Sequence, residues 1–101
     1  MLDFENFYFP PCDTELAAEI LKRKLKVCKD WQDGLRALAS IYAMNIQRDI
    51  AEDAKLRLYD IYLAKFPNSP PFAVLKAAQI VENNIVWRIL RSEKRYERSG
   101  K

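Results

Sequence analysis

Four arginines near the C-terminal end of the chain have the residue type and spacing that could bind phosphate. They follow one another at steps of three, four and three residues, which in a helix places their guanidinium groups on one face. Arginine donates bidentately to phosphate and stacks on bases, and a neighbouring tryptophan offers a further stacking surface. The candidate set, for nucleic acid or for an acidic partner protein, is Trp87, Arg88, Arg91, Lys94, Arg95 and Arg98.

The same residues have a simpler interpretation as the solvated end of a helix. Cations near a helix C-terminus interact favourably with its dipole, and the stem of Arg91 can cover Trp87. No helix-turn-helix signature is present in residues 31–66. Three interpretations therefore stay open for this surface: a solvated tail, a site for an acidic protein, and a nucleic-acid site whose binding depends on salt.

The second candidate set is aromatic and lies at the other end of the chain. Four rings fall within six residues, ahead of Pro10 and Pro11, which hold the link extended. Each ring can bury on the order of 150 to 250 Å², so we expect this arm to pack against an apolar surface. The predicted apolar interface consists of the arm residues Phe4, Phe7, Tyr8 and Phe9 and of a stripe on a later helix, Leu56, Tyr59, Leu63 and Phe66. The arm could pack on its own chain, across a homodimer or on another protein.

Few groups for catalysis or metal binding are present. Histidine is absent, and two separate cysteines without histidine do not complete a four-ligand zinc site. The two glycines are isolated, so they form no glycine-rich phosphate-binding loop. We therefore expect no enzyme activity, no cofactor, no metal site and no small-molecule substrate. Cys12 and Cys28 are expected to be reduced and structural, with Cys28 on the apolar face of a helix.

Helices are predicted to carry these candidate residues. Long stretches without glycine or proline favour helices, and Asp13, Asp30 and Ser69 have the position of N-caps. Apolar periodicity predicts four helices at about 14–29, 31–47, 50–66 and 71–97. No breaker stands between residues 35 and 66, so one long, bent helix is an alternative for the two middle helices.

Two of these helices have faces with a predicted role. The basic run in the first helix is expected to form a solvated face, partly neutralised because Glu19 can pair with Lys22 and Arg23. The inward side of the last helix is predicted to be Val74, Leu75, Ala78, Ile85, Val86, Ile89 and Leu90.

The predicted fold class is all-α: a compact bundle of about four helices with an N-terminal aromatic arm and a protruding basic C-terminal helix. The arm covers residues 1–12, a single helical domain covers 13–92, and the basic end of the last helix covers 93–101. The net charge of +3 is modest and does not by itself indicate nucleic acid.

The N-terminus carries Asp3 and Glu5 and is followed by no apolar run, so we expect a protein that is not secreted and is cytoplasmic, or nuclear in a eukaryote. No stretch has the length of about 18 apolar residues that a membrane span needs. The leading hypothesis is a non-enzymatic protein-interaction or regulatory module that acts through helix faces, with a homodimer as one form of it. The alternatives are a small nucleic-acid-binding protein that uses the arginine face, and a subunit of a larger complex.

Overall fold

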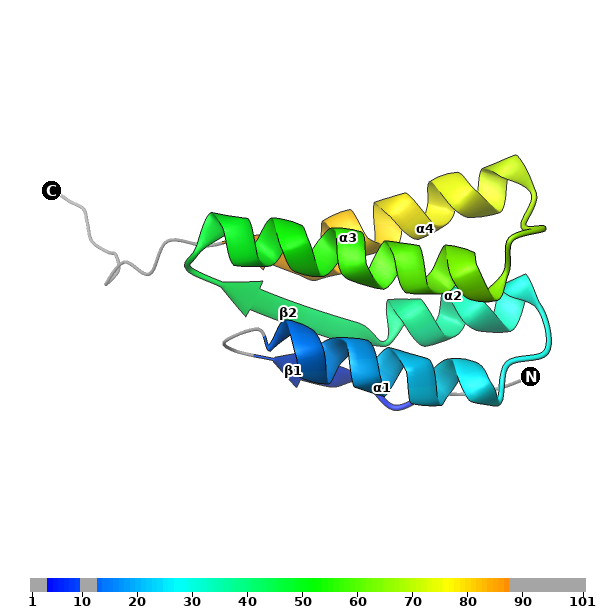
Figure 1. Cartoon of the computed structure of the whole chain (residues 1–101), viewed down its shortest axis with the longest axis horizontal. Coiled ribbons are helices and arrows are strands. Elements are labelled where there is room, and N and C mark those ends of the chain that lie inside the picture. Colours follow the sequence, from blue (N-terminus) through cyan, green and yellow to red (C-terminus); the bar gives the residue numbers. More distant parts are fainter. Residues whose placement is uncertain (1–3, 10–12, 88–101) are drawn as a thin grey trace, which may run out of the picture.

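Helices and strands alternate in a repeated order, β-α-α-β-α-α-β, within the part of the chain that this computed structural model describes, residues 4–9 and 13–87 (Figure 1). The elements are β1 (Phe7–Phe9), α1 (Thr14–Lys26), α2 (Trp31–Ala39), β2 (Ile41–Asn45), α3 (Arg48–Lys65), α4 (Pro71–Asn84) and β3 (Ile85–Trp87). Within these residues the protein is therefore mostly helical, with one small sheet.

Two of the helix starts follow the capping residues that the sequence predicts. The Asp13 carboxylate accepts a hydrogen bond from the backbone N–H of Leu16 at 3.0 Å, and Asp30 accepts one from the N–H of Asp33 at 2.9 Å. The last helix differs in its cap. Ser69 does not cap it but donates its hydroxyl to a carbonyl at the end of α3, and α4 instead begins with proline at its first position.

The helices pack in pairs around one apolar core. In Figure 1, α1 and α3 run in the same direction, and they pack on each other as α2 packs on α4. Fully buried alanines, among them Ala17, Ala37, Ala54 and Ala77, allow the helix backbones to approach closely. The largest fully buried side chains are Leu21, Leu38, Ile41, Leu58, Tyr62 and Ile85.

Three parallel strands form the sheet, with β2 between β1 and β3. Phe7 aligns with Ile41, and Ala43 aligns with Ile85. Burial alternates along β2: Ile41, Ala43 and Asn45 are buried, whereas the residues between them are half-buried. One face of the sheet therefore belongs to the core that the helices share.

The prediction of a mostly helical protein with four helices is confirmed for the described residues, but the three-stranded sheet means that the fold is not all-α, and the single helix over 31–47 is wrong. The helix ends at Ala39, where the Ser40 hydroxyl donates to the Ala37 carbonyl at 2.7 Å, and a strand follows. A short apolar run such as 41–45 does not reveal by periodicity whether it is helix or strand, and here pairing with two distant segments decides. Two helices with a strand between them therefore replace the single long helix considered for 35–66.

The last helix is also shorter than predicted. It ends at Asn84, whose side-chain amide donates to the Ala39 carbonyl at 3.0 Å, and the next three residues form β3. The predicted helix over 71–97 is therefore wrong at 85–87, where β-branched residues favour a strand. Residues 88–101 lie outside the described residues.

Candidate interaction surfaces

Trp87 is the one member of the arginine set that the described residues include. It lies on strand β3 and is 41% exposed, and its indole N–H donates to the Ile46 carbonyl at 2.9 Å. The guanidinium of Arg48 lies 5.4 Å from the centre of its ring. Trp87 is therefore held by its own chain instead of standing on a helix face. The other members lie outside the described residues: Arg88, Arg91, Lys94, Arg95 and Arg98.

The aromatic arm pairs with its own chain. The backbone N–H of Phe7 donates to the Ser40 carbonyl at 2.7 Å, and β1 continues alongside β2. On α1, the Lys24 ammonium donates to the Glu5 carbonyl at 2.7 Å. The same ammonium lies 5.2 and 5.3 Å from the ring centres of Phe4 and Phe7. Burial of Lys24 lowers its pKa, while the charge of Glu5 raises it.

A second aromatic contact holds the middle of the arm to the sheet. Tyr8 stacks on Tyr42 of β2 with 5.0 Å between the ring centres. Phe9 completes β1. The arm thus lies beside β2 and α1, and these contacts do not bring it onto the predicted stripe of α3.

The structure divides the predicted stripe between two surroundings. Leu56 is exposed, and Tyr59 and Leu63 are half-buried. The ring of Phe66 instead lies 5.6 Å from the ring of Tyr62 and packs against α2 at Gly34. The stripe is therefore not one continuous interface, because its last residue belongs to the contact between α2 and α3.

Leu56 and Tyr59 line a groove between α3 and α4, here called the apolar groove, with a volume of about 330 Å³. Its remaining lining residues are Glu52, Lys55, Ala78, Val81 and Glu82. Lys55 bridges the groove by pairing with Glu52 at 3.1 Å and with Glu82 across the helices. The hydrogen bond to Glu82 is the main cause that raises the pKa of Lys55.

The outer side of α4 carries exposed apolar residues that sequence reasoning missed. Leu75, predicted to face inward, is 61% exposed, and Phe72 is 65% exposed. The buried residues are instead Ala73, Ala77 and Val81. Since α4 carries apolar residues on most of its circumference, periodicity alone does not identify the buried face; the small alanines do, because they permit close contact with α2.

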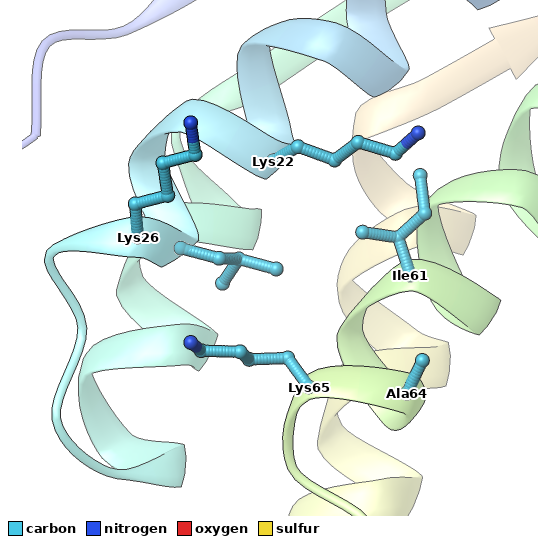
Figure 2. A pocket seen from close by; sticks show the side chains of 6 residues that line it. Lys22, Lys26, Ile61, Ala64 and Lys65 are labelled. Carbon is cyan, nitrogen blue, oxygen red and sulfur yellow. The ribbon is translucent and has the colours of Figure 1, made fainter.

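A second groove, here called the basic groove, lies between α1 and α3 and has a volume of about 360 Å³. Figure 2 shows Lys22 and Lys26 on α1 and Lys65 on α3 around it. The apolar side chains that line it are Leu25, Ile61 and Ala64. Among the described residues, none of the three lysines forms an ion pair, and Glu19 pairs with neither Lys22 nor Arg23, so the predicted neutralisation within the first helix is wrong.

Cys28 is free and buried, in agreement with the expectation for this residue. Its thiol donates to the Lys24 carbonyl at 3.4 Å. Burial raises the pKa of the thiol, and the charges of Asp33 and Asp30 raise it further, while Lys65 lowers it. The thiol is therefore protonated near neutral pH and is a poor nucleophile.

Comparison with protein-family models, with curated proteins and with solved structures finds no match for this chain. No helix within residues 4–9 and 13–87 is long and apolar enough to cross a membrane. In the same residues, no group of three or more acidic, cysteine or histidine side chains could hold a metal ion. The functional argument therefore depends on the two grooves and the surfaces around them.

Proposed function

We propose that this protein is a non-enzymatic interaction module that binds another protein through the faces of its helices. The observation that carries the proposal is the apolar surface on α3 and α4, where Leu56, Phe72 and Leu75 are each exposed over more than half of their surface. Large apolar side chains gathered on one exposed surface are typical of protein-binding sites.

An inclined row of apolar side chains crosses the outer side of α4 and ends at the apolar groove. Phe72, Leu75 and Ala78 follow at steps of three residues and form this row, and Phe72 at its start packs edge-on against Trp31 of α2, with 5.3 Å between the ring centres. Ala78 lines the apolar groove, and Leu56 lines it from the opposite helix. A partner helix that lies along this row can place its apolar side chains in the groove.

Site-specific photo-crosslinking in the native cell tests this proposal. A photoreactive residue at position 75 should give a defined crosslinked protein, and Leu56→Asp should remove that product. The control places the same photoreactive residue at position 19, in place of the exposed Glu19 of α1, and should not give the crosslinked product. If position 75 yields no product that Leu56→Asp removes, the proposal is wrong.

Self-association is one form of this function and has its own measurement. Light scattering at rising protein concentration should show a dimer that Leu75→Glu dissociates, if a second copy occupies the apolar surface. A monomer at all concentrations assigns the surface to a different protein, such as a subunit of a larger complex. We propose a cytoplasmic, or in a eukaryote nuclear, location for either form.

Nucleic-acid binding through the arginine set is the alternative proposal. Its support is the spacing of the arginines and the nearby cation–aromatic contact of Arg48 with Trp87. Replacing Arg91 and Arg95 with glutamate should abolish a salt-sensitive gel shift while helicity is retained. The absence of any shift in the unaltered protein at low salt would exclude this alternative.

A further inference from the structure

The cations around the basic groove differ from those elsewhere between the helices. At one end of the contact between α1 and α3, Arg57 pairs bidentately with Glu15 at 3.1 and 3.2 Å. Between α3 and α4, Lys55 pairs with two glutamates. At the other end of the contact between α1 and α3, the three lysines of the basic groove have no anionic partner among residues 4–9 and 13–87.

Position in the helices explains part of this arrangement. Lys26 and Lys65 lie in the last turns of α1 and α3, where the helix dipole favours cations. Because the two helices run in the same direction, both of these ends meet at the basic groove. The dipoles favour lysine at these positions, but they supply no counterion for the cluster of positive charge that results.

The floor of the basic groove is aliphatic. Leu25 is 3% exposed, Ile61 is half-buried and Ala64 is exposed. Lys22 extends from α1 toward α3, and Lys65 extends from α3 toward α1, so their ammonium groups lie on either side of this floor (Figure 2). The methylene stems of the lysines add to the apolar surface.

We infer that the basic groove binds an acidic amphipathic helix of a partner protein, with apolar side chains on the aliphatic floor and carboxylates at Lys22, Lys26 and Lys65. Lys22 and Lys26 are one helical turn apart, which matches carboxylates one turn apart on the partner. The site is independent of the proposed apolar surface, since the two grooves lie on different sides of α3.

This chemistry favours an acidic helix over nucleic acid at the groove. Bases bind on aromatic rings and arginine planes, whereas this floor is aliphatic and its cations are lysines. A phosphate ion alone would leave the floor uncovered. An amphipathic acidic helix satisfies both the charge and the apolar area.

A fluorescent synthetic helix of glutamate, leucine and alanine, with leucines one turn apart and flanking glutamates, is the probe. Fluorescence anisotropy with the full chain should show binding that weakens with salt. Two matched peptides test the two parts of the site. Replacing the leucines with serine removes the apolar part, and replacing the glutamates with lysine reverses the charge; both should abolish binding.

Variants of the protein locate the site. Lys22→Glu and Lys65→Glu should each weaken binding by about fivefold, the size of an exposed ion pair. Ala64→Glu, at an exposed helix position, should weaken it by placing a carboxylate on the floor. Lys76→Glu on α4 changes the net charge equally and should leave binding unchanged. Circular dichroism confirms that each variant is folded.

Three results would overturn the inference. The serine peptide could bind as well as the leucine peptide, which would reduce the site to nonspecific attraction of anions. Lys76→Glu could weaken binding as much as Lys22→Glu, which would place the interaction elsewhere. An oligonucleotide or an anionic vesicle could bind more tightly than the peptide and lose binding on Lys22→Glu, which would assign the groove to that ligand instead. None of these results depends on the apolar surface, which the crosslinking experiment tests separately.

Discussion

Gly34 of α2 lies directly against the aromatic ring of Phe66, at the end of α3. A Cβ atom at this position would lie 2.8 Å from Cδ2 of Phe66 and 2.9 Å from Cε1 of Tyr62, closer than carbon atoms normally approach. The glycine is buried within a helix, where alanine would ordinarily be preferred. The absence of a side chain is therefore what lets the two helices meet here.

The Gly34→Ala variant is accordingly expected to be destabilised. Alanine at an ordinary helix position gains about 1 kcal/mol over glycine, whereas overpacking here should cost about 1 to 3 kcal/mol. Urea unfolding measures the free energy of unfolding. In a Phe66→Leu background the same substitution should cost less, because the smaller side chain gives way. A more stable Gly34→Ala protein would show that the close contact is absent.

The buried Tyr62 hydroxyl should contribute to stability in a pH-dependent way. It lies 3.1 Å from the Ser69 hydroxyl and 3.4 Å from the Trp31 carbonyl oxygen, and Tyr62→Phe should lower the free energy of unfolding by about 1 kcal/mol. Burial raises the pKa of Tyr62, while the hydrogen bond with Ser69 lowers it. Because the folded state favours the neutral phenol, this contribution is complete below the usual pKa of about 10 and is lost as pH rises through the folded-state pKa.

The unaltered protein and the Tyr62→Phe variant should differ in how their free energy of unfolding changes with pH. Urea unfolding at about pH 8 and about pH 11 should show a larger loss of stability for the unaltered protein than for Tyr62→Phe. An equal loss in both proteins would mean that Tyr62 does not titrate differently on folding.

Lys24 should determine how firmly the arm is held. Lys24→Ala removes the hydrogen bond to the Glu5 carbonyl and the contacts with two aromatic rings. If these contacts contribute about 1 kcal/mol to the free energy of locally opening the arm, their loss would make the Phe7 amide exchange its hydrogen about fivefold faster. Exchange measured by NMR reports this directly. Lys26→Ala, which removes no contact with the described arm residues 4–9, should leave the Phe7 rate unchanged, and equal rates in all three proteins would contradict the role assigned to Lys24.

The Cys28 thiol should resist alkylation in the folded protein. In a Cys12→Ser variant, Cys28 is the only thiol, and its burial and raised pKa predict slow reaction with iodoacetamide at neutral pH. Reaction should become fast in urea, where the thiol is exposed and its pKa returns toward the ordinary value. Mass spectrometry follows both rates, and fast reaction in the native protein would show that the thiol is accessible.

Local patterns were sufficient to predict where α1 and α2 begin, because Asp13 and Asp30 act on backbone groups a few residues away. They were insufficient for β2 and β3. Residues such as Ile41 and Ile85 suit a helix or a strand by periodicity, and the choice depends on segments far away in sequence. The strand content of this chain is therefore a property of tertiary pairing.

The grooves were hidden from sequence reasoning for a related reason. Lys22 and Lys65 belong to helices that only the fold brings together, so the basic run of α1 gave no sign of a shared site. The exposed position of Leu75 depends on which side of an almost uniformly apolar helix meets α2. In both cases the missing information was which helix packs on which.

The order of the elements also constrains how the chain can fold. Phe7 pairs with Ile41 and Ala43 pairs with Ile85, so each ladder of the sheet closes only after a complete pair of helices has been bridged. Closing such long loops before other contacts form is entropically unfavourable. We therefore expect α1 to pack on α2, and α3 on α4, before the strands pair. Late pairing of the strands makes folding slower than in a protein whose helices contact only their neighbours in sequence.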